Sequence, residues 1–210
     1  QCKISKSYLG KDRLQEFTGI TNLSGQFIYG TNALDFDQAT ISSYSISADA
    51  ESSPKVSVDI KIFGDFKPAT SIQAGTADYG FENLGPESTF IDVEGRNSLL
   101  TNFSYGVDFD VKPTYEISST KASTSRIQSP IKYSTSADML MDEQEFVDLT
   151  GLMESETFNR SITFNMQNES STVLNTYNIP NASISSQSAS VTAGDLVKMS
   201  VKYQGLELNV

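Results

Sequence analysis

The feature that most limits how this chain can fold is a regular alternation of apolar and polar residues in four separate stretches. In "KVSVDIKIFG" (55–64) every second residue is apolar from the first valine on, and similar patterns occupy residues 102–111, 131–141 and 197–203. Successive side chains of a β-strand point to opposite faces, so each stretch would place one face in a core and the other in water. That arrangement is typical of antiparallel sheets.

Turn-forming residues separate these stretches, and one segment between them has the pattern of a helix. "DEQEFVDLTGLMESE" (142–156) places Phe146, Leu149 and Met153 on one helical face, and the carboxylates of its first turn suit the helix dipole. We therefore expect residues 1–210 to form one mainly β unit. Its predicted architecture is an antiparallel β-sandwich or small barrel with one flanking α-helix at about 142–155.

A short phrase near the start of the chain returns near its end. "ATISSYSIS" (39–47) is echoed by "ASISSQSAS" (182–190), and after a turn the strand Val56–Gly64 aligns with Val197–Gly205. Each copy reads as a β-hairpin, at about 37–66 and about 180–208. An internal duplication explains the match, and so does chance similarity between serine-rich hairpins, because serine is abundant in this chain.

Both predicted hairpins have a small, hydroxylated polar face. A two-stranded ribbon of this kind is marginal alone, and its edges are open to pairing with another strand. Pairing with further copies of the chain would close a ring or barrel in which no edge remains. The candidate assembly residues are Ser43, Ser45, Ser47, Val56, Val58 and Ile60 in the first hairpin, and Ser186, Ser188, Val197, Met199 and Val201 in the second.

The composition argues against several functional classes. The chain contains no histidine, which removes the commonest general base and the commonest metal ligand. We therefore expect no enzyme, no catalytic residues, no cofactor and no metal. The aspartates in "LDFDQ" and "VDFDV" lack the spacing of a calcium loop and are expected to lie on solvated strand faces. No apolar run is long enough for a membrane span, so no membrane partner is expected.

The net charge of −11, from 26 acidic and 15 basic residues, argues against a protein that grips nucleic acid. It is compatible with a surface past which nucleic acid slides, because carboxylates repel phosphates in a confined channel. The same charge would also serve merely to keep the protein soluble.

Three stretches resemble the tail tube proteins of long-tailed bacteriophages: "ISSYSISADAESSPKVSVDIKIFG", "NFSYGVDFDVKPTYEISSTKASTSRIQSPIKYSTSADMLM" and "VTAGDLVKMSVKYQGLEL". The resemblance spans most of residues 37–210 and lies in pattern and short phrases. It implies a β-sandwich or small barrel with a helix at its side. It further implies long hairpins that join an inter-subunit β-barrel around a channel, with the rings stacked into a tube.

The function implied by this resemblance is structural: a self-assembling conduit through which viral DNA is ejected. The implied partners are copies of the chain itself, in stacked rings of three or of six, and other tail proteins such as a terminator, a tape measure or a baseplate or distal tail protein. Viral DNA would pass without specific binding. The implied location is the virion tail, assembled in the cytoplasm of the host bacterium. The alternative is a monomeric extracellular or surface β-sandwich that binds carbohydrate or protein.

Overall fold

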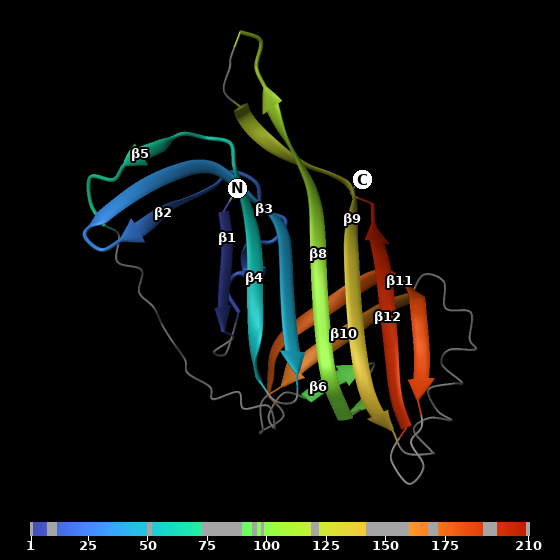
Figure 1. Ribbon diagram of the computed structural model, residues 1–210. Helices are drawn as coiled ribbons and strands as arrows, with labels where there is room; N and C mark the ends of the chain where they lie inside the picture. The colour runs from blue at the N-terminus through green and yellow to red at the C-terminus, as the bar shows by residue number, and fades with distance from the viewer. Residues whose placement is uncertain are drawn as a thin grey trace.

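The computed structural model is built almost entirely of β-strands (Figure 1). It describes residues 2–7, 12–49, 52–72, 90–93, 96–97, 99–118, 122–141, 160–167, 172–190 and 197–208. The elements are β1 (Cys2–Ser7), the 3-10 helix η1 (Gln15–Phe17), β2 (Leu23–Tyr29), β3 (Asn32–Asp49), β4 (Ser52–Ile62), β5 (Phe66–Pro68), β6 (Phe90–Val93), β7 (Arg96–Asn97), β8 (Leu99–Tyr115), β9 (Ala122–Met141), β10 (Arg160–Gln167), β11 (Val173–Ser190) and β12 (Val197–Glu207).

Ten of these strands form one continuous antiparallel sheet in the order β1-β4-β3-β8-β9-β12-β11-β10-β6-β7, while β2 and β5 pair with β3 outside this path. The sheet curls into a half-barrel (Figure 1). The prediction of a mainly β, antiparallel chain is therefore confirmed. The described residues contain no α-helix of seven or more residues, and the helix predicted at 142–155 lies outside them. None of the described helices is long and apolar enough to cross a membrane.

The alternating residues form the core as the period of two requires. β10 and the first half of β11 cross behind the strands from β3 to β12 (Figure 1), and aromatic rings fill the space between the two layers. The ring of Phe103 on β8 lies 5.2 Å from that of Phe164 on β10, and Tyr105 lies 5.0 Å from Tyr177 on β11. These rings dominate the apolar burial that stabilises the half-barrel.

β11 belongs to both layers because it bends in the middle. Its first half pairs with β10 up to Ala182, and the residues from Ser183 to Ser190 pair with β12 instead. Gly205 of β12 lies beneath the bend. A Cβ atom at this glycine would come within 2.4 Å of the Pro180 carbonyl oxygen and 2.5 Å of Ile179 Cγ2. The missing side chain thus allows the two layers to approach closely at this point.

Two parts of the sheet project beyond the half-barrel, and bulges mark where they begin. The ladder between β2 and β3 shifts between the pairs Leu23–Ala39 and Gly25–Phe36, and the ladder between β8 and β9 shifts at Phe109. We call the first projection the wing, made of β2, β5 and residues 32–36 of β3. The second, the arm, consists of residues 110–115 of β8 and 122–128 of β9.

Hydrogen bonds join the outer half of the arm, at residues 123–125, to the wing side of the molecule. The Asn22 amide donates to Thr124 Oγ1 at 3.1 Å, and the Gln38 amide donates to the Ser123 carbonyl at 3.3 Å. Between them, the buried hydroxyls of Thr40 and Ser125 lie 2.5 Å apart. These contacts hold the outer half of the arm beside the part of the chain that leads into the wing, and the tip extends beyond the sheet (Figure 1).

The buried carboxylate of Asp12 ties the N-terminal segment to the core. It accepts hydrogen bonds from the Tyr44 hydroxyl at 2.7 Å and from the Leu14 backbone N–H at 3.0 Å, and it forms an ion pair with Lys6 at 3.1 Å. The side chain of Asp12 is fully buried. A buried carboxylate needs such partners, because desolvation would otherwise disfavour its charge.

We predict that Asp12→Ala lowers the free energy of unfolding by about 3 kcal/mol, because it leaves the Tyr44 hydroxyl buried without its acceptor. Urea denaturation followed by circular dichroism measures this change. The matched control is Asp37→Ala, which removes an exposed carboxylate 3.9 Å from Lys67 and should cost less than about 1 kcal/mol. Equal effects at the two positions would show that the buried network does not stabilise the fold.

Four core tyrosines share the effect of burial. Burial is the main cause that raises the pKa of Tyr44, Tyr105 and Tyr133 above the usual value for tyrosine, and it raises the pKa of Tyr177 to about 12. Their hydroxyls therefore stay protonated at a higher pH than those of exposed tyrosines, and they act as hydrogen-bond donors. Tyr133 donates to Glu207 Oε2 at 2.5 Å and Tyr105 to the Asn178 carbonyl at 3.3 Å.

Candidate functional site

The sheet face that points away from the core carries rows of serine. One row crosses seven strands from β1 to β11, and each member pairs directly with the next: Ser5, Ser57, Ser45, Gly106, Ser134, Gln204 and Ser183. The neighbouring row contains Lys55, Ser47, Ser104, Ser136, Lys202 and Ser186. Because paired residues point to the same side of a sheet, the two rows form one surface, which we call the serine face.

Hydrogen bonds between strands organise the hydroxyls of this face. Ser5 Oγ lies 2.5 Å from Ser57 Oγ, and Ser104 Oγ lies 2.6 Å from Ser136 Oγ. In the adjoining rows, Ser43 donates to Asp59 Oδ2 at 3.0 Å and Ser200 donates to Asp138 Oδ1 at 2.5 Å. The surface is therefore small, polar and ordered by its own contacts.

Opposite charges are placed across from each other beside the serine rows. Lys3 pairs across strands with Asp59, and Lys132 with Asp108. Lys198 forms an ion pair with Asp138 at 3.9 Å. Cross-strand neighbours of opposite charge attract each other, so most of the charge on this side of the sheet is balanced locally.

The acidic excess of the sequence is located elsewhere. The described ranges contain 13 acidic and 13 basic residues, so the net charge of −11 belongs entirely to the segments between them and at the chain ends. The sequence suggested channel walls that repel phosphate through carboxylates. The serine face differs from this expectation in its charge, since it is mainly hydroxylated and its only charged members are Lys55 and Lys202.

The structure places the candidate residues of the first hairpin on β3 and β4, in the middle of the sheet. Val56, Val58 and Ile60 are buried in the core, whereas the serines at 43, 45 and 47 lie on the opposite side. β1 pairs with the outer side of β4, and β8 pairs with the outer side of β3. This hairpin was expected to seek partners in other subunits, but its strand pairing over these residues is completed within the chain.

The second hairpin, β11 and β12, is only half enclosed. Met199 and Val201 are buried and Val197 is half-buried, while Ser186 and Ser188 are exposed. β12 lies between β9 and β11, but the outer side of Ser183–Ser190 pairs with no strand among the described residues. We call this segment the β11 edge. Its backbone N–H and C=O groups on that side can accept another strand.

The two hairpins also have the same orientation within the sheet. β4 and β3 are followed, after β8 and β9, by β12 and β11 in the corresponding order. Since every pairing on this path is antiparallel, β3 and β11 run in the same direction. The serines of both hairpins therefore lie on one continuous face rather than on opposite ones.

The sequence predicted strands at 102–111 and 131–141 but did not predict that their serines join the two sets of hairpin serines. Ser104, Ser134 and Ser136 lie on β8 and β9, and Ser5 lies on β1. Their hydroxyls sit at every second residue in "NFSYG" and "YSTSAD", the same signal that identified the hairpins. The missing information was that β8 and β9 lie between the hairpins, because local patterns do not specify strand order.

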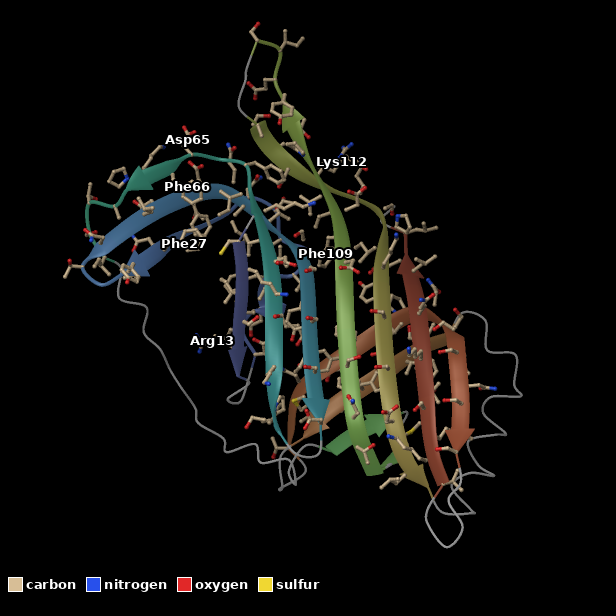
Figure 2. The ribbon with its side chains drawn as sticks, in the orientation of Figure 1. Arg13, Phe27, Asp65, Phe66, Phe109 and Lys112 are labelled. Atoms are coloured by element: carbon tan, nitrogen blue, oxygen red, sulfur yellow. The ribbon has the colours of Figure 1, made fainter. Side chains whose placement is uncertain are left out.

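The wing exposes an aromatic cluster. The ring of Phe27 lies 4.9 Å from Phe36 and 6.0 Å from Phe66, which is half exposed, and Tyr29 at the tip is 90% exposed. Figure 2 shows Phe27 and Phe66 close together on this projection, with Lys112 on the separate arm. The arm ends in Ile117, which is 99% exposed. Both projections thus offer apolar contacts to another molecule.

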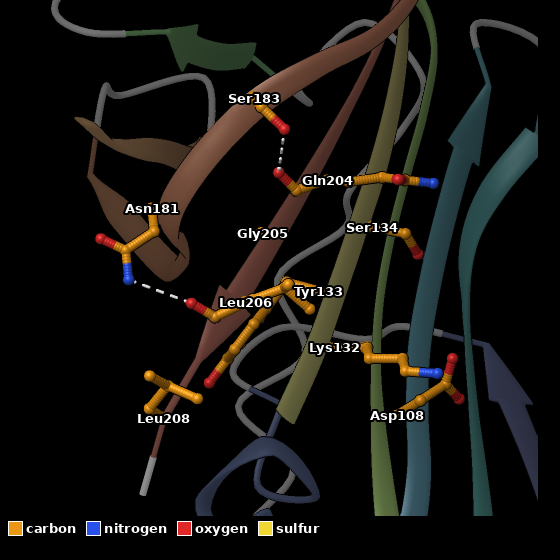
Figure 3. Close-up of a pocket in the computed structure, with 10 residues that line it drawn as sticks. All are labelled: Asp108, Lys132, Tyr133, Ser134, Asn181, Ser183, Gln204, Gly205, Leu206 and Leu208. Carbon is orange, nitrogen blue, oxygen red and sulfur yellow. Dashed lines mark hydrogen bonds between the residues drawn. The ribbon is translucent and has the colours of Figure 1, made fainter. Parts of the chain in front are cut away.

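A groove lies where β11 bends over the end of β12 (Figure 3). The Asn181 amide donates to the Leu206 carbonyl at 3.0 Å, and Ser183 donates to the Gln204 carbonyl at 3.4 Å. Leu206 and Leu208 are largely exposed along it, and Lys132 and Asp108 border its far side. The groove combines an apolar strip with polar groups, which suits binding of a chain segment or a sugar.

Within the described ranges, no three or more cysteine, aspartate or glutamate side chains gather into a group that could hold a metal ion. A scan against protein-family models found no match to this sequence, and a search of curated proteins also found none.

Proposed function

We propose that this chain is a structural protein that assembles into rings through its sheet edges, in the manner of the tail tube proteins that its sequence resembles. The observation that carries the proposal is the β11 edge, an eight-residue strand segment whose outer side pairs with no other strand that the structure describes. All residues from Ile184 to Ser190 are exposed, and the segment has none of the charges or prolines that protect natural sheet edges. Such an edge is suited to joining another strand.

The serine face supports a conduit role for the assembled rings. None of the members of its two rows is an aromatic residue on which bases could stack, and its only charged members are Lys55 and Lys202, which lie on β4 and β12 with three strands between them. Counterion release from phosphates requires a dense cationic surface, which this face lacks. If the serine face lines the channel, DNA would slide past hydroxyls without being retained. The DNA, the ring of three or six copies and the neighbouring tail proteins belong to this proposal.

The wing and the arm complete the proposed assembly. Both extend beyond the half-barrel and expose apolar side chains at their tips, including Tyr29 and Ile117. A two-stranded ribbon such as the arm gains stability when a further surface covers it. We assign these projections to contacts between successive rings, where the apolar tips would become buried.

Negative-stain electron microscopy of the full chain at increasing concentration tests this proposal. We expect rings or short tubes, and sedimentation velocity should show the corresponding large species. A protein that stays monomeric at the highest concentration, with no rings on the grid, would contradict assembly.

The groove of Figure 3 supports a second candidate function, a surface module that binds carbohydrate or protein. It predicts a monomer that binds a glycan or peptide, and that loses binding when Leu206, which is half exposed, is replaced by aspartate. Screening a glycan array with the wild type and with Leu206→Asp distinguishes this function from assembly.

A further inference from the structure

Within the part of the chain that the structure describes, the seven strands from β1 to β11 end in two edges of similar length that pair with no further strand. β1 forms the other end of the seven-strand part of the sheet, and among the described residues only β4 pairs with it. β1 contributes six residues, and the β11 edge contributes eight. One surface of the molecule therefore ends in β1 and the opposite one ends in the β11 edge.

Strand direction determines how these edges could meet. Six antiparallel pairings separate β1 from β11, and each one reverses the direction, so both edges run the same way. Copies related by rotation about a common barrel axis keep their strand directions. β1 of one copy beside the β11 edge of the next would thus form a parallel ladder. Two β11 edges related by a two-fold axis would instead form an antiparallel ladder.

The residues along the two edges favour the first arrangement. The serine row begins at Ser5 on β1 and ends at Ser183 on β11, so joining the edges would continue an uncharged row around a ring. On the core side, Ile4 is half-buried and Ile184 is 36% exposed. A stagger of two residues from that register would instead place these isoleucines side by side, with Ser5 opposite Ser185 rather than Ser183, and closed barrels require a stagger of this kind.

We infer that the β11 edge binds β1 of a second copy as a parallel strand, so that the chains associate head to tail. This inference rests on the proposed function and names the strand that the edge accepts. A head-to-tail contact uses two different surfaces and leaves one of each open at the ends of any chain of copies. Only a closed ring pairs both of these edges in every copy.

Disulfide cross-linking between copies tests the inference directly. All variants carry Cys2→Ser, which removes the only natural cysteine. One protein carries Ser5→Cys, and its partner carries Ser183→Cys, Ser186→Cys or Ser188→Cys, all of which lie on the same side of the sheet. Each protein is oxidised alone and in a mixture with its partner. The control is Ser45→Cys, which lies on the same serine row but in the middle of the sheet.

We expect a covalent dimer band in at least one mixture of Ser5→Cys with a β11 variant, and no dimer band in the single proteins or with Ser45→Cys. The β11 variant that forms the cross-link shows which residue of the β11 edge lies beside Ser5, and this gives the stagger between the two strands. Dimers of a β11 variant alone would show two-fold pairing and overturn the inference, while assembly itself would stand. Rings visible by microscopy without cross-links in any mixture would overturn it as well. Monomers without rings would overturn both the inference and the proposed function.

Discussion

Gly205→Ala is expected to lower the free energy of unfolding by about 2–3 kcal/mol, the range typical of overpacking in a closely packed core. A Cβ atom at this position would come within 2.4 Å of the Pro180 carbonyl oxygen, and backbone atoms cannot rotate away as a side chain can. The bend of β11 would have to move off β12. Urea denaturation followed by tyrosine fluorescence measures the change, with the slope showing whether unfolding stays two-state.

Gly106→Ala is the matched control, because it also lies within a strand and on the serine row. The nearest atom to its Cβ would be Ser134 Oγ at 3.1 Å, a hydroxyl that can rotate. Alanine restricts the unfolded chain more than glycine, so the net change should stay within about 1 kcal/mol. If both alanines cost the same, close approach at Gly205 does not limit the packing of the two layers.

The close contact at Gly205 also shows which features of the fold could not be predicted from the sequence. The alternation in 197–203 predicts β12 and its buried face, and the structure confirms both. Nothing in the local pattern states that Pro180 lies above Gly205, because that contact depends on β11 leaving one layer for the other. The same limit explains why hairpins were predicted at about 37–66 and 180–208 without their place in the sheet, where the β3–β4 and β11–β12 pairs lie two strands apart. Strand order is set by long-range packing.

For the candidate site, the first hairpin shows which features could be predicted from the sequence and which could not. Its serines and valines were assigned to the correct faces, since the period of two determines the side on which each residue lies. Whether an edge of this hairpin was open to another strand depended on the position of β1. With six residues, β1 is too short for its alternation to predict that position. As a result, a proline at Val58 would disrupt a buried strand paired on both sides and would unfold the protein, so it says nothing about assembly.

Proline substitutions at the β11 edge distinguish an effect on folding from an effect on assembly. Neighbouring residues of a strand direct their backbone N–H groups to opposite sides, so of Gln187 and Ser188 one faces β12 and the other faces the unpaired side. Proline at the outward-facing position should keep the wild-type urea midpoint and abolish rings, because it removes a donor that only another copy would use. Proline at the inward-facing position should lower stability by about 1–3 kcal/mol.

The two proline variants form a matched pair, since their positions are adjacent on the same strand and both are exposed. Circular dichroism and urea midpoints identify the variant that folds normally, and sedimentation velocity with microscopy then reports its assembly. If the stable variant forms rings as readily as the wild type, copies of the chain do not meet at the β11 edge. If it remains monomeric while fully folded, the hydrogen bonds of this edge hold neighbouring copies together. Assembly then follows from the two open edges of one sheet, β1 and the β11 edge.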